Sequence, residues 1–132
     1  PLKALWRKTD ARKRIASGGY DAVVLQEDLP ETTVDTFHEY ANRFHEEIRA
    51  SGARTVLLMA WPYERLSWIS TEGIADAHRA VAARTGASVS PVALAFQRAR
   101  GARKGIRLLA ADEEHPSPSG TYLAAATVFA TL

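Results

Sequence analysis

The residues from Asp112 to Tyr122 are the part of the sequence best suited to chemistry. They read Asp-Glu-Glu-His-Pro-Ser-Pro-Ser-Gly-Thr-Tyr and place an aspartate three residues before a histidine, ahead of the last helix that the pattern predicts. A carboxylate can bind one imidazole nitrogen, which leaves the other free to take a proton from a nucleophile. Asp112 and His115 are therefore candidate members of a catalytic triad. The alternative is a solvated acidic loop, because acidic residues are favoured near a helix N-terminus.

The nucleophile of such a triad is missing from the sequence. No serine stands in a Gly-x-Ser-x-Gly or Gly-Asp-Ser context, and the chain has no cysteine. A metal site is disfavoured as well, because the four consecutive residues from Asp112 to His115 cannot all face one ion and no second histidine stands at a ligand spacing. The sequence thus predicts part of a hydrolase site, with no metal and no organic cofactor.

Polar residues at the end of a predicted strand are the next candidates. The apolar run 22–25 is followed by Gln26 and Glu27. A glutamine amide can donate a hydrogen bond to an oxyanion, and Glu27 could bind substrate or orient a neighbour. The alternative is that both are strand-end groups satisfied by loop backbone.

Aromatic residues are concentrated in the loop 60–70, which holds Trp61, Tyr63 and Trp68. Aromatic rings in a loop can line a pocket for an acyl group or a sugar. They can equally pack the loop with its own side chains. Trp61 and Tyr63 are our candidates for substrate binding, with loop packing as the alternative.

Helical patterns and short apolar runs alternate along the chain. Helices are predicted over the ranges 3–16, 33–50, 71–84, 91–102 and 117–132. Buried strands are predicted at 22–25 and 54–59, and a third short strand at 87–90. This alternation predicts an α/β domain with a parallel sheet and helices on both faces. Ligands bind outside the carboxyl ends of such strands, where the loops 26–32, 60–70 and 110–117 would gather.

Side-chain patterns refine these helices. In the first helix the residues expected to face inward are Leu5, Trp6 and Ile15. Thr71 and Ser117 are expected to cap the helices that follow them, because a hydroxyl can accept a hydrogen bond from the first turn. The six basic residues of the first helix indicate a solvated face, since only Trp6 is available there to stack on a nucleic-acid base.

The composition is that of an ordinary soluble globular protein with one domain, residues 1–132. Hydrophobic residues make up 46% and charged residues 24%, and the net charge of +2 is too small to indicate a nucleic-acid partner. No apolar run approaches the ~20 residues that span a bilayer, and no signal peptide is visible. The sequence does not decide between a cytoplasmic and an exported protein, because the N-terminus of a chain starting at Pro1 is not informative.

These motifs resemble the C-terminal two thirds of an SGNH/GDSL-type hydrolase domain. In that family an Asp-x-x-His motif before the last helix supplies two triad members, and Asp112 and His115 match it in type, spacing and position. The following Pro116 to Leu123 resembles the His-Pro-Ser continuation of one bacterial branch. The resemblance implies a flavodoxin-like α/β/α sandwich and a Ser-His-Asp esterase or lipase that acts on a small acyl ester, an acetylated sugar or a lipid.

The sequence departs from the family pattern at two places. Gln26 stands where the family has an oxyanion-hole asparagine, and the serine and glycine blocks are absent. The resemblance therefore implies a serine upstream of Pro1, missing N-terminal strands and a chain that is inactive alone. A sheet shortened in this way would expose an edge, which predicts pairing with the missing segment or self-association. The alternative is a non-catalytic α/β module that binds a ligand or a partner protein.

Overall fold

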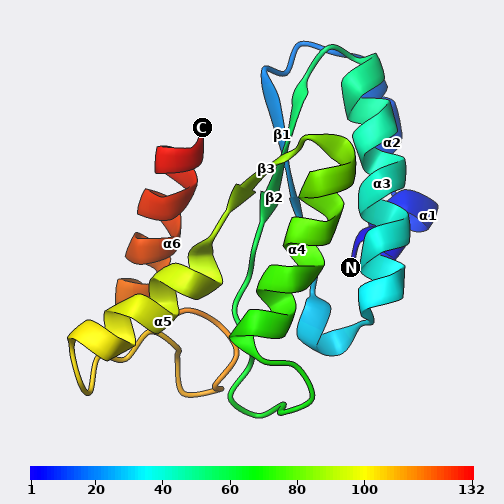
Figure 1. The fold of residues 1–132 in the computed structure, drawn as a ribbon. Helices are drawn as coiled ribbons and strands as arrows, with labels where there is room; N and C mark the ends of the chain where they lie inside the picture. Colours follow the sequence, from blue (N-terminus) through cyan, green and yellow to red (C-terminus); the bar gives the residue numbers. More distant parts are fainter.

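Three parallel strands form the centre of the molecule (Figure 1). The computed structural model describes residues 1–132 and orders the strands as β1 (Ala22–Gln26), β2 (Arg54–Leu58) and β3 (Ser88–Ser90). Gln26 pairs in register with Leu58, which pairs with Ser90. The carboxyl ends of all three strands therefore lie at one edge of the sheet, as the alternating pattern predicts.

Helices lie on both sides of this sheet. The helices are α1 (Leu2–Lys8), α2 (Ala11–Ala16), α3 (Val34–Ala50), α4 (Thr71–Thr85), α5 (Val92–Ala102) and α6 (Pro118–Thr131), with a 3-10 turn at Leu29–Glu31. Figure 1 shows α3 and α4 on one side of the sheet and α6 on the other. None of the helices combines the length and the apolar character that a membrane crossing requires.

The central strand is buried on both faces. Leu57 belongs to the larger core, which the helices α1 to α4 build with the sheet. The next residue, Leu58, packs against a smaller core of Val92, Phe96, Leu108 and Leu109 under α5 and α6. Because successive side chains of a strand point to opposite faces, one strand connects the two cores. This explains why the sequence shows a continuous apolar run here.

The predicted helix 3–16 is wrong as one element, because it breaks into α1 and α2. Thr9 has extended backbone, and its hydroxyl donates to Leu5 O at 2.7 Å and accepts from Ala11 N at 3.2 Å. These side-chain bonds compete with the helical ladder. After the break Ile15 is buried as predicted, but Leu5 is 41% exposed, and Leu2 takes the buried position in α1.

Of the two predicted helix caps, one is confirmed and one is displaced. The Ser117 hydroxyl accepts from Gly120 N at 3.1 Å at the start of α6, as predicted. At the start of α4 the cap is Ser70, which accepts from Gly73 N, while Thr71 is the first helical residue. Both residue types are good caps, so composition alone does not choose between neighbours.

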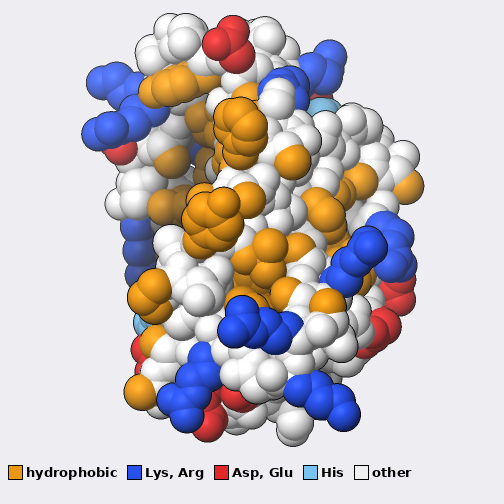
Figure 2. Space-filling view, turned by 90° about the vertical axis from the view of Figure 1, so that its left-hand side faces the viewer, with side chains coloured by type: hydrophobic (Ala, Val, Ile, Leu, Met, Phe, Trp, Pro, Cys, Tyr) orange, Lys and Arg blue, Asp and Glu red, His pale blue; other side chains and the backbone are white.

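The outer edge of β1 has no strand beside it. Val24 is 40% exposed there, and an apolar groove of about 330 Å³ runs along the edge, lined by residues that include Leu5, Ile15 and Tyr20. Hydrophobic side chains gather on the side of the molecule that carries α6 (Figure 2), where Phe129 is 83% exposed. Parallel sheets are normally covered on both faces. In this fold the outer edge of β1 and the α6 side both leave apolar side chains exposed to solvent.

Replacing Gly120 should destabilise the seat of α6. A Cβ at this position would lie 2.0 Å from Leu108 O, whereas a Cβ at Gly101 in α5 would meet nothing within 4 Å. We expect Gly120→Ala to lose about 1–3 kcal/mol of unfolding free energy, and the control Gly101→Ala to gain up to about 1 kcal/mol. Urea unfolding measures both. Equal stability of Gly120→Ala and wild type would contradict the close contact of α6 with Leu108.

Acid should destabilise the protein through His78. The ring is 1% exposed, donates from Nδ1 to Ile74 O at 2.8 Å and has no hydrogen-bond partner at Nε2. Burial lowers the pKa of His78 below its ordinary value of 6.5. Between 6.5 and the lowered pKa, the histidine of the unfolded chain is protonated while that of the folded chain stays neutral. Stability should therefore fall as the pH drops from 6.5 toward the lowered pKa. Between pH 7 and pH 5 the midpoint of urea unfolding should fall less for His78→Leu than for wild type. If the midpoint depends on pH equally in both proteins, His78 is not the origin of the acid sensitivity.

Candidate functional site

Asp112 and His115 form a hydrogen-bonded pair in the connection between α5 and α6. His115 Nδ1 lies 2.8 Å from Asp112 Oδ2. Since a carboxylate only accepts, Nδ1 carries the proton in this bond. The other carboxylate oxygen accepts from the backbone N–H groups of Glu114 at 3.0 Å and His115 at 2.9 Å. His115 Nε2 has no partner in the protein, and the side chain is 72% exposed.

These contacts shift the pKa values of both members of the pair in opposite directions. The backbone N–H of Glu114, the His115 side chain and the His115 N–H stabilise the anion and lower the pKa of Asp112 to about 2. The hydrogen bond to Asp112 raises the pKa of His115 above its ordinary value of 6.5. The arrangement therefore presents an imidazole with one nitrogen held by a carboxylate and the other turned to solvent, as a general base requires.

The loop that carries the pair is closed by its own backbone. Leu109 and Pro116 form an antiparallel bridge, and Ala110 N donates to His115 O at 2.8 Å. Ser117 N then donates to Leu108 O at 2.9 Å. Inside the loop Glu113 has a positive φ of 60°, which costs a residue with a side chain roughly 1–2 kcal/mol. A hairpin-like closure of this kind holds Asp112 and His115 in one turn.

A second segment, residues 61–65, holds this loop from outside. Trp61 Nε1 donates to Glu114 O at 2.9 Å, and Glu64 N donates to Glu113 O at 3.0 Å. The Trp61 ring stacks on Phe96 with a centroid distance of 4.7 Å. The polar atom of Trp61 is therefore used within the protein, and only its ring surface remains to contact a ligand.

The end of β1 provides the third part of the site. Gln26 is exposed, and its side chain makes no hydrogen bond to the protein. Glu27 is 1% exposed and turned inward, where its carboxylate accepts from Leu2 N at 3.2 Å and Asp28 N at 2.9 Å. Glu27 thus anchors the N-terminus of α1, while Gln26 is free for an incoming group.

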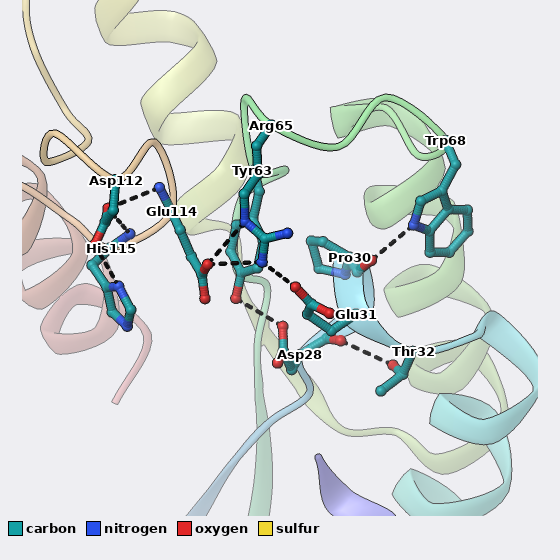
Figure 3. Close-up of polar contacts among 10 residues, drawn as sticks. All are labelled: Asp28, Pro30, Glu31, Thr32, Tyr63, Arg65, Trp68, Asp112, Glu114 and His115. Atoms are coloured by element: carbon teal, nitrogen blue, oxygen red, sulfur yellow. Dashed lines mark hydrogen bonds and ion pairs between the residues drawn. The ribbon is translucent and has the colours of Figure 1, made fainter.

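Figure 3 shows how Tyr63 and Arg65 lie between the loop of His115 and the segment after β1. The Tyr63 hydroxyl donates to Asp28 Oδ1 at 2.7 Å, and burial, followed by this hydrogen bond, raises the pKa of Tyr63. Arg65 binds Glu31 on one side and Glu114 on the other. The structure therefore brings Asp112, His115, Trp61 and Tyr63 to one edge of the sheet.

Sequence reasoning missed Asp28 and Arg65. Asp28 contributes to the raised pKa of His115 by its negative charge, and it follows Gln26 by two residues, so its proximity to the same edge could have been inferred. Arg65 belongs to a loop expected to meet the loops holding Glu31 and Glu114. Opposite charges in three converging loops were the available signal.

A cavity of about 700 Å³ adjoins the other side of the His115 loop, lined by residues that include Glu64, Arg100, Arg107 and Glu113. Arg100 is paired with Glu64 at 2.6 Å. Nowhere do three histidine, aspartate or glutamate side chains come together as a set that could hold a metal ion. The cavity is a space of ligand size next to the loop of the candidate pair.

Fold and site together are those of an α/β protein that presents its polar groups at the carboxyl ends of a parallel sheet. A solved structure described as "a putative SGNH hydrolase from Slackia heliotrinireducens" matches this chain with a TM-score of 0.79 and 28% identity. The match covers 98% of this chain and 77% of that one, which confirms the predicted fold class. No protein-family model and no curated protein matches the sequence.

Asp112→Asn should lower the pKa of His115 toward 6.5. The carboxylate is the largest cause of the raised pKa, and asparagine keeps an oxygen for the backbone N–H groups of the turn. We expect NMR titration of the imidazole Cε1–H signal to show the shift in Asp112→Asn. Glu113→Gln serves as a control, because Glu113 is a neighbour without a contact to the ring. In this variant His115 should titrate as it does in wild type. An unshifted His115 in Asp112→Asn would mean that the pair is not formed in solution.

Proposed function

We propose that the protein is a serine hydrolase of the SGNH type that acts on an ester in a small acyl compound, an acetylated sugar or a lipid. The observation that carries the proposal is the 2.8 Å bond between Asp112 Oδ2 and His115 Nδ1, with Nε2 unpartnered. The similarity in fold to the structure described as an SGNH hydrolase supports it.

In the proposed reaction His115 Nε2 takes the proton of a serine hydroxyl while the serine oxygen attacks the ester carbonyl carbon. Asp112 keeps Nδ1 protonated and stabilises the imidazolium that forms. The amide of Gln26 donates to the oxyanion, and the ring faces of Trp61 and Tyr63 contact the substrate. His115 then returns the proton to the alcohol that leaves, and water hydrolyses the acyl-enzyme.

The serine of this proposal is not among the 132 residues, and the free edge of β1 supports a source outside them. A strand added in parallel there would end beside Gln26, because parallel strands align their carboxyl ends. The exposed Val24 and the apolar groove along the edge would be covered in the same step. On this proposal the 132-residue chain alone is inactive and tends to pair with such a segment or with itself.

The second candidate is a non-catalytic α/β module that binds an acyl or carbohydrate ligand, or a partner. It is favoured by the absence of any serine hydroxyl in hydrogen-bond contact with His115. Ser117, the serine two residues after His115, is engaged elsewhere, because its hydroxyl donates to Arg107 O at 2.8 Å and caps α6.

Fluorophosphonate labelling distinguishes the two functions. The 132-residue chain and the whole polypeptide encoded by its gene should be treated in parallel with a His115→Ala variant of each. We expect an adduct only on the whole polypeptide, at a serine outside residues 1–132, and its loss in His115→Ala, because Nε2 activates the serine. Intact mass and peptide mapping give the site. No adduct, or an adduct that survives His115→Ala, would favour the non-catalytic module.

A further inference from the structure

Arg65 connects two loops that are distant along the chain. Its Nε and Nη2 donate to Glu114 Oε2 at 3.1 and 2.8 Å, and Nη2 also binds Glu31 Oε1. Glu114 lies 49 residues and Glu31 34 residues from Arg65 in sequence. One guanidinium therefore holds the loop of His115 and the segment that follows β1 at the same time (Figure 3).

Glu114, the residue next to His115, is held at two points. Arg65 binds its carboxylate, and Trp61 Nε1 binds its carbonyl oxygen at 2.9 Å. With both its backbone and its side chain bound, this residue has little freedom to rotate. The base of the candidate pair thus follows directly after an anchored residue.

The other side of the contact is fixed in a similar way. Tyr63, two residues before Arg65, donates to Asp28 at 2.7 Å, and the Arg65 guanidinium lies 5.3 Å from the centre of the Tyr63 ring. The segment 61–65 therefore reaches the end of β1 through Asp28 and through Glu31. A planar guanidinium with donors in a fixed fork suits two acceptors in different directions, which a lysine ammonium cannot match in geometry.

We infer that Arg65 is a positioning residue that sets the separation between His115 and the carboxyl end of β1 by binding Glu114 and Glu31 together. That this separation matters for a reaction rests on the proposed function. Asp112 orients the ring within its own loop, whereas Arg65 places that loop relative to the strand. The two tasks fall to different residues, so they can be removed separately.

The chain offers a matched control for an ordinary surface ion pair. Arg79 binds Asp76 three residues away on the same helix, and both side chains are well exposed. Exposed pairs of this kind contribute little to stability. Removing Arg79 deletes one surface arginine and one ion pair without touching either loop of the candidate site.

The experiment compares wild type, Arg65→Gln, Arg65→Lys and Arg79→Gln by amide hydrogen exchange and by NMR titration of His115. In Arg65→Gln we expect the amides of 110–117 and 27–33 to exchange about two- to fivefold faster, as loss of a small ion-pair network predicts. The pKa of His115 should rise, because Glu31 and Glu114 lose their neutralising charge. Arg79→Gln should match wild type in both readouts.

Arg65→Lys separates charge from geometry. It keeps the cation, so the titration of His115 should return to that of wild type. It lacks the fork, so the fast exchange of 110–117 should persist. Wild-type exchange of 110–117 in Arg65→Gln would overturn the inference. Full recovery of both readouts in Arg65→Lys would also overturn it, because charge alone would then suffice.

These readouts need no substrate and no nucleophile. They therefore report on Arg65 whether or not the whole polypeptide reacts with the fluorophosphonate. Faster loop exchange in Arg65→Gln without any fluorophosphonate adduct would uphold the positioning contact and reject the hydrolase. An adduct with unchanged loop exchange would uphold the hydrolase and reject the role of Arg65.

Discussion

The Asp112 carboxylate is the group on which the candidate site depends. One oxygen accepts two backbone N–H groups and closes the turn, and the other holds the imidazole of His115. The same anion thus builds the loop and orients the imidazole of His115. Because backbone donors contribute to its low pKa, Asp112 stays ionised wherever His115 titrates. The pair therefore consists of an imidazole beside a permanent negative charge, which favours the Nδ1–H tautomer and an available Nε2.

The parallel sheet determines where this pair can act. All three strands end at the same edge, so the connections that follow β1 and β2, together with the loop before α6, meet there. The segment 61–65 lies between the other two and contacts both through side chains, and the His115 loop also through a backbone hydrogen bond. The outer edge of β1 differs from the rest of the sheet, because no strand covers it and the larger core ends there at an apolar groove. The fold is thus well packed from β2 toward the α3 and α4 side and open beside β1.

The strands, the long helices and the candidate pair could be predicted from hydrophobicity and residue spacing alone. The apolar runs placed β1 and β2, the helical spacing of apolar residues placed α3 and α4, and the Asp-x-x-His spacing placed the pair. What failed, the single helix 3–16 and the Thr71 cap, depended on single side chains. The Thr9 hydroxyl breaks the first helix, and Ser70 displaces the expected cap. The inward turn of Glu27, which binds Leu2 N, is also a contact that the sequence pattern does not show. Contacts of this kind arise from three-dimensional neighbours, which periodicity does not encode.

The exposure of His115 has a consequence for any chemistry at this site. A side chain that is 72% exposed has water at Nε2, and a nucleophile must displace that water before it can give up a proton. Solvent around the pair also screens part of the attraction between Asp112 and the imidazolium, because water has a high dielectric constant. A segment seated beside β1 would exclude water from the space next to Gln26, which would ease the approach of the nucleophile and strengthen the attraction between Asp112 and the imidazolium. On the proposed function, the open edge and the exposed base are therefore two aspects of one incomplete site.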